Sequence, residues 1–181
     1  AAKETTSNEL RNDIVYKTIL ILEQNGDKMS VSLPLKLTSK GFEFTVSGNT
    51  LNTFLMNVYG ASSVDSLTEE QASSTADDIF KYMRGKDLFN ISETYSDEAA
   101  LKILAVRYEI WLNRYQQYMS VQLADGISEE SYAAIKENSD ELLGMEVSVE
   151  SHRVYNDSVY FAQIIGYIGN ISNEELEKYN E

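Results

Sequence analysis

The stretch Ser96–Tyr115, SDEAALKILAVRYEIWLNRY, carries the strongest helix signal in the chain. Ser96 is a residue type that caps helix N-termini. Apolar and amphipathic side chains then recur at helical spacing, so that one face of the helix carries a broad aromatic stripe. We interpret this stripe as core packing. Its members are Ala100, Leu104, Arg107 by its aliphatic stem, Tyr108, Trp111, Leu112 and Tyr115.

The residues before this helix predict more helices and one short antiparallel pair of strands. Thr6 with Glu9 and Thr68 with Gln71 are capping boxes, and each precedes apolar residues at helical spacing. Two segments alternate apolar and polar residues around a turn at 39–41. The expected elements are a helix from Thr6 to Asn25, strands at 30–33 and 42–46, a helix over 51–58 that ends at Gly60, and a helix over 68–85.

The residues after Tyr115 predict a smaller, strand-bearing part. Residues 120–123 and 145–150 alternate as strands do, and residues 128–138 between them have helical spacing. A final helix over 161–167 and a turn capped by Ser172 follow. We therefore predict an α+β fold with a helix-rich head over residues 1–115, which contains the short β pair, and a strand-helix-strand part over residues 116–181.

Composition and charge restrict the possible functions. Lys and Arg total 15 against 29 Asp and Glu, which gives a net charge of −14 and disfavours nucleic acid as a partner. No apolar run approaches the roughly 20 residues that cross a bilayer. Cysteine is absent, so the chain has neither a disulfide framework nor a thiolate metal site, and the single histidine, His152, excludes a two-histidine zinc site.

Further patterns argue against catalysis and ligand binding by the chain itself. The glycine-spaced run at 164–172, IIGYIGNIS, has no basic residue nearby and is followed by glutamates, so we expect it to repel a phosphate. Adjacent acids such as Asp77-Asp78 and Glu129-Glu130 fall in first helical turns, where the helix dipole favours them. No serine has a lysine three residues later. We predict no catalytic, cofactor-binding or metal-binding residue.

Several motifs occur in an order that resembles a known family. They are RYEIWLN at 107–113, YMSV at 118–121, RVY at 153–155 and GYIGNISNEEL at 166–176. This set resembles the N-terminal, non-catalytic module of class B penicillin-binding proteins, where Arg-x-Tyr precedes Gly-Tyr-x-Gly and Glu-Glu-Leu. The likeness is best from Ser96 onward. The chain departs from the family pattern at Asn156, where proline is usual, and at Gln163, where histidine is usual.

The resemblance implies a pedestal, also called a dimerisation domain, that lifts a DD-transpeptidase domain from the membrane. The parent protein would be membrane-anchored, extracytoplasmic and acylated by β-lactams, from a Gram-positive bacterium, and this chain would be a piece of it. The implied partners are its own transpeptidase domain, a polytopic membrane glycosyltransferase and other cell-wall proteins. The implied interdomain motif comprises Arg153, Tyr155, Gly166, Tyr167, Gly169 and Glu174.

Two other functions fit the composition. The chain would be an independent surface-exposed module that binds a protein or a glycan if no transpeptidase accompanied it. It would be a carboxylate-based hydrolase of the cell wall if two acids faced one pocket. The ordered Arg-x-Tyr and Gly-Tyr-x-Gly motifs favour the pedestal over both.

Overall fold

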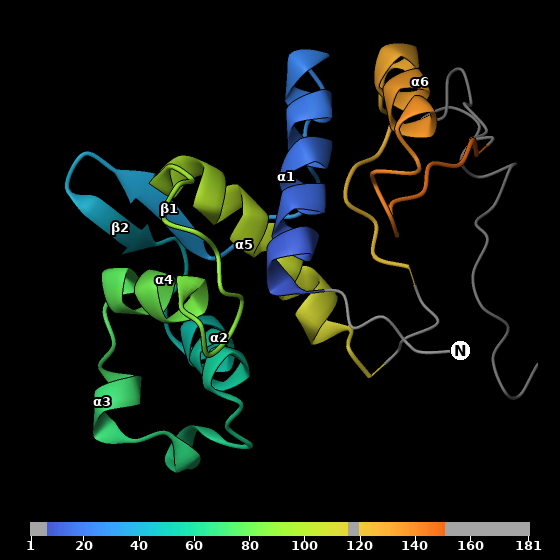
Figure 1. The fold of residues 1–181 in the computed structure, drawn as a ribbon. Coiled ribbons are helices and arrows are strands. Elements are labelled where there is room, and N and C mark those ends of the chain that lie inside the picture. The colour runs from blue at the N-terminus through green and yellow to red at the C-terminus, as the bar shows by residue number, and fades with distance from the viewer. Residues whose placement is uncertain (1–6, 116–119, 151–181) are drawn as a thin grey trace, which may run out of the picture. The chain divides into compact units, whose positions relative to one another are not determined.

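The structure is a computed structural model that describes residues 7–115 and 120–150. The chain divides into two compact units, Ala1–Val147 and Ser148–Glu181, and only residues 148–150 of the second are described. The first unit is rich in helices, and the only sheet among its described residues is a two-stranded antiparallel pair (Figure 1). The predicted α+β class is therefore confirmed, while the division at residue 115 stays a prediction.

Helix α1 (Asn8–Gln24) begins one residue later than predicted, because the predicted cap, Thr6, implied a start at residue 7. The hydroxyl of Ser7 accepts the amide hydrogen of Leu10 at 3.2 Å, so Ser7 is the cap rather than Thr6. Serine is the better cap residue of the two, so the error was to choose Thr6 from its spacing to Glu9. The helix ends at Asn25, as predicted. Its wide apolar face buries Ile14, Val15, Ile19 and Leu22.

The β-hairpin consists of β1 (Leu35–Thr38) and β2 (Gly41–Phe44), and the predicted strand at 30–33 is wrong. The two-residue turn places Thr38 opposite Gly41 and Leu35 opposite Phe44, so the first strand lies after Pro34. The turn length fixes the register, and within the part of the chain that the structure describes no strand lies beside residues 30–33. Gly41 has φ +117°, a left-handed backbone conformation that favours glycine.

The helices after the hairpin differ from the prediction at one point. Helix α2 (Asn49–Tyr59) ends at Gly60 with φ +69°, as expected. The predicted helix over 68–85 is two helices, α3 (Glu69–Ala72) and α4 (Ala76–Arg84), with a 3₁₀ turn, η1 (Val64–Ser66), before them. Thr75 and Asp78 form a second capping box that starts α4 afresh.

Helix α5 (Asp97–Leu112) is capped by Ser96 and contributes to the main core, as predicted. Its side chains at Ile103, Leu104 and Val106 have no exposed surface, so the helix is buried on more than one side. The stripe is shorter than predicted, because the helix stops at Leu112, whose side chain is 36% exposed, and the Tyr115 side chain beyond it is 84% exposed. The hairpin packs onto this core through Phe42, whose ring stacks on Phe80 at 3.8 Å.

Helix α6 (Glu129–Glu137) is capped by Ser128, as predicted, but the strands expected at 120–123 and 145–150 are not present. A segment that alternates apolar and polar residues forms a strand only when a second strand lies beside it to pair with. Met145 and Val147 instead pack individually against a small cluster that α6 forms with α1. Figure 1 shows α1 between the hairpin and α4 on one side and α6 on the other.

Candidate functional site

The predicted interdomain residues all lie outside the described residues, so their roles stay predictions. They are Arg153, Tyr155, Gly166, Tyr167, Gly169 and Glu174. The described residues offer a different candidate, which is the set of polar contacts that hold α1 to segments distant in the sequence. These contacts restrict the movement of α1 relative to the segments that it touches.

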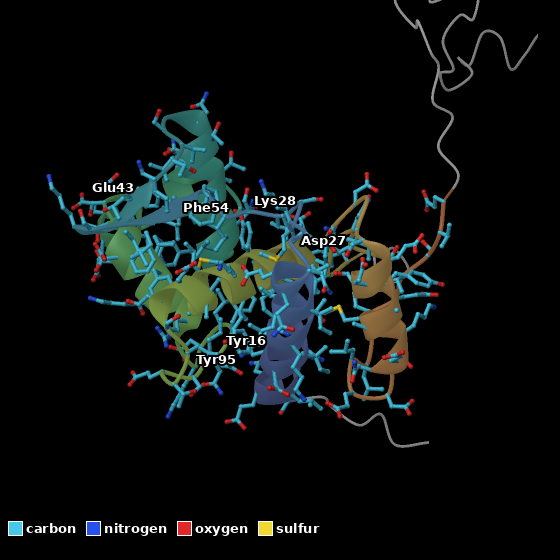
Figure 2. All side chains as sticks on the ribbon, turned by 90° about the horizontal axis from the view of Figure 1, so that it is seen from above. Tyr16, Asp27, Lys28, Glu43, Phe54 and Tyr95 are labelled. Atoms are coloured by element: carbon cyan, nitrogen blue, oxygen red, sulfur yellow. The ribbon has the colours of Figure 1, made fainter. Side chains whose placement is uncertain are left out.

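The first contact joins α1 to the loop before α5. The Asn12 side chain is 1% exposed, and its Nδ2 donates to the carbonyls of Phe89 at 3.0 Å and Asn90 at 3.1 Å. Asn90 has φ +48°, a left-handed conformation that asparagine tolerates better than most residues. The rings of Tyr16 and Tyr95 meet edge to face at 4.9 Å beside this contact, as the two labels in Figure 2 show.

A buried arginine reinforces the same end of α1. Arg107 Nη2 donates to Asn8 Oδ1 at 2.8 Å, and its guanidinium lies 5.5 Å from the centroid of the Phe89 ring. Burial, together with the charge of Arg11, lowers the pKa of Arg107 to about 10. The cation is therefore held by a neutral amide and an aromatic ring rather than by a carboxylate.

Arg84 organises the loop that leads into α5. Its Nη1 donates to Asp97 Oδ1 at 2.7 Å, and its Nη2 donates to the carbonyls of Ser92 at 2.8 Å and Tyr95 at 2.7 Å. One guanidinium thus joins the end of α4 to the first turn of α5 with charge-assisted hydrogen bonds.

Asp27, just after α1, holds the start of α6. Its carboxylate accepts the Ser128 amide at 3.1 Å and the Ser128 hydroxyl at 2.7 Å. The hydroxyls of Ser131 and Ser128 lower the pKa of Asp27. Nearby, Asn25 Nδ2 donates to the Ser131 hydroxyl at 3.1 Å. Figure 2 shows Asp27 between α1 and α6, so α6 is tied to α1 by polar contacts as well as by apolar packing.

The adjacent acidic residues Asp77-Asp78 and Glu129-Glu130 lie at the starts of α4 and α6. Asp77 accepts the Phe42 amide at 3.2 Å and thereby joins α4 to β2. Asp78 accepts the Thr75 amide and hydroxyl, and these bonds lower its pKa. Glu129 and Glu130 lie in the first turn of α6, as predicted. Both pairs therefore lie in first helical turns, but only Asp78 caps its helix, and Asp77 links α4 to the hairpin.

Two shallow cavities open on the described surface. One, of about 370 Å³, is lined mainly by α2, Pro34 and Tyr108. The other, of about 390 Å³, lies between the start of α1 and the loop at 90–95. Within residues 7–115 and 120–150, no three His, Cys, Asp or Glu side chains come together as metal ligands. No helix in the same residues has the length and apolar character needed to span a membrane.

Sequence reasoning missed Asn12, Arg84 and Asp27. The partners of Asn12 and Asp27 lie far along the chain, at separations of 77 residues for Asn12 with Phe89 and 101 for Asp27 with Ser128, and local spacing does not reveal such pairs. The partners of Arg84 are only 8 to 13 residues away, but they lie in an irregular loop and at the start of α5, where no periodic spacing relates them to Arg84. Of these three residues, only Asn12 could have been recognised from the sequence, because it is a polar residue on the apolar face of a predicted helix.

Comparison with known families gives one match. The family model described as "Penicillin-binding Protein dimerisation domain" matches residues 3–181. Among curated proteins, none matches the chain.

Proposed function

The chain belongs to the family of penicillin-binding protein dimerisation domains, and from this premise we propose that it is the pedestal of a peptidoglycan-synthesising penicillin-binding protein. In this role it positions a DD-transpeptidase domain that follows it and docks other cell-wall proteins. The single observation that carries the proposal is the family match over residues 3–181. A dimerisation domain is non-catalytic, so the chemistry of the parent protein belongs to its other domain.

The described contacts support the role of a rigid spacer. A spacer transmits position only if its elements do not move independently, and here charged or amide side chains join elements that apolar packing also joins. Asn12 and Arg107 join the start of α1 to α5 and the loop before it. Asp27 joins the segment after α1 to α6. Hydrogen bonds to a charged group are stronger than bonds between neutral groups.

The join to the transpeptidase is the role that we propose for Arg153, Tyr155, Gly166, Tyr167, Gly169 and Glu174. The Arg153 guanidinium would bind an acidic or carbonyl partner beside the two tyrosines, and the two glycines would allow a tight turn. The parent protein would sit at the outer face of the cell membrane, with a polytopic membrane glycosyltransferase among its partners.

The coding sequence after Glu181 tests the proposal directly. We expect Ser-x-x-Lys, Ser-x-Asn and Lys-Thr-Gly there, in that order, and a stop codon in their place would refute the pedestal. A fluorescent penicillin should label the intact protein covalently and leave this chain unlabelled. Stoichiometric labelling of the chain alone would contradict its non-catalytic assignment.

A variant tests the proposed join. Arg153→Ala should reduce the rigidity between the two domains of the intact protein, measured by the spread of distances between spin labels placed in each. The same change should leave the unfolding midpoint of the isolated chain nearly constant. Equal losses of stability in both contexts would place Arg153 inside this module instead of at its join.

A further inference from the structure

The segment between α2 and α4 is folded, but it lies almost entirely outside the core. It covers residues 62–74 and contains η1 and α3, neither of which has a buried residue. Its half-buried residues are Leu67, Gln71 and Ser74, and Leu67 is its one apolar side chain that packs against the main core. In Figure 1 the segment forms the lower edge of the first unit, beyond α2. Few contacts therefore attach it to the rest of the unit.

The hydrogen bonds of this segment are almost all internal. Capping boxes at Ser63 and Thr68 hold η1 and α3, and each box closes on a residue of the same segment. The backbone hydrogen bonds of residues 62–74 also end within the segment. One hydrogen bond leads out of it, between the hydroxyls of Ser74 and Tyr59 at 2.8 Å. Its acidic side chains form no ion pair with any described residue, so apolar contact at Leu67 and one hydroxyl pair hold it down.

Both neighbouring helices have caps that do not involve this segment. Helix α2 ends at Gly60, whose φ of +69° turns the chain out of the helix, and no atom lies within 4 Å of a Cβ built there. Helix α4 begins with its own capping box between Thr75 and Asp78. Movement of the segment would therefore leave the ends of α2 and α4 hydrogen-bonded as they are.

We propose that residues 62–74 form a strap that detaches from the core as one unit while α1, α2, α4 and α5 stay folded. Detachment separates the hydroxyls of Tyr59 and Ser74 and lifts Leu67 from the core, but it breaks no backbone hydrogen bond. Segments with little buried surface and few bonds to their surroundings open at a lower free energy than global unfolding. The open state exposes the core surface under Leu67 and the Tyr59 hydroxyl. The strap lies outside the contacts that join α1, α5 and α6, so its opening is independent of the pedestal function.

A thiol placed at Leu67 tests the proposal, because the chain has no cysteine of its own. The reaction of Leu67→Cys with the aromatic disulfide DTNB should be about 5-fold slower than that of Val64→Cys, because Val64 lies in the same strap but is 46% exposed. Below the unfolding transition the rate should hardly change with urea, since local opening exposes little surface. A rate that rises with urea in step with global unfolding would overturn the proposal, and so would a rate equal to that of Val64→Cys.

A second substitution tests whether the strap opens as one unit. Tyr59→Phe removes the hydroxyl that holds Ser74 at the far end of the strap, and it should speed the reaction of Leu67→Cys about 5-fold, the usual effect of one hydrogen bond. Tyr82→Phe makes the same change on the neighbouring ring, whose hydroxyl has no hydrogen bond among the described residues, and should leave the rate unchanged. Neither change should affect Val64→Cys. An unchanged rate of Leu67→Cys in Tyr59→Phe would mean that the thiol moves alone or reacts in the closed state, which overturns the proposal.

Discussion

Replacing Leu142 by alanine tests whether α6 belongs to the same cooperative unit as the main core. Leu142 is 1% exposed, and it packs with Ile14 and Leu22 of α1 and Ile135 of α6. Truncation leaves a cavity between the two helices, and a fully buried leucine replaced by alanine costs about 3 kcal/mol of unfolding free energy. With a urea slope of about 2 kcal/mol per M, the unfolding midpoint should fall by about 1.5 M.

The assay exploits the position of the single tryptophan. Trp111 lies on α5 and packs against the main core, far along the chain from the substitution. Urea unfolding is followed by Trp111 fluorescence and by far-ultraviolet circular dichroism in parallel. If α1, α5 and α6 unfold together, both signals should move to the same lower midpoint in Leu142→Ala.

The neighbouring residue supplies a matched control. Leu143 has the same side chain but is 64% exposed, so Leu143→Ala should change stability by less than about 0.5 kcal/mol. A Leu142→Ala variant that lost helical signal early while Trp111 kept its original midpoint would refute the reasoning. That result would instead support a division of the chain near residue 115.

Two further predictions concern single residues. The folded-state pKa of Asp27 lies below its ordinary 3.8. Its stabilising contribution is therefore complete above the ordinary pKa and lost as pH falls through the folded-state value. Asp27→Asn should weaken the acid dependence of stability, measured by urea unfolding across a pH series; an unchanged dependence would contradict the bonds to Ser128. Gly60→Ala should cost about 1 kcal/mol in thermal unfolding, because φ is +69° there and no atom lies within 4 Å of the added carbon, so that only the backbone is strained. Gly60→Asn should cost less, and equal losses would argue against a left-handed cap.

The helices were predictable because their start and stop signals are local. Ser96 and Ser128 cap the helices that the sequence assigned to them, and Gly60 ends α2. Each signal needs only residues within one turn, so no tertiary contact is required to recognise it. The error over residues 68–85 was also local. Thr75 and Asp78 form a second capping box, and taking it into account would have divided the helix that was expected to be continuous.

The strands were less predictable because a strand needs a partner. Residues 145–150 alternate as regularly as β2 does, yet among the described residues only the β1–β2 hairpin supplies a paired neighbour through a tight turn. Without that turn, alternation does no more than place Met145 and Val147 on the same side to pack against α1 and α6. The candidate contacts were unpredictable for a related reason, since Arg107 and Asn8 are 99 residues apart.

Helix α1 explains why a mostly helical module of this kind can be stiff. Its Val15 and Ile19 pack into the main core, whereas its Ile14 and Leu22 pack against α6. Because these positions occupy adjoining faces of one helix, neither cluster can loosen without disturbing the helix that the other uses. Polar contacts from Asn12 in the first half of α1 and from Asp27 just after its last turn oppose sliding along the helix axis. We therefore expect a displacement applied to α6 to be passed to α5 through α1, which is the mechanical property that a pedestal requires.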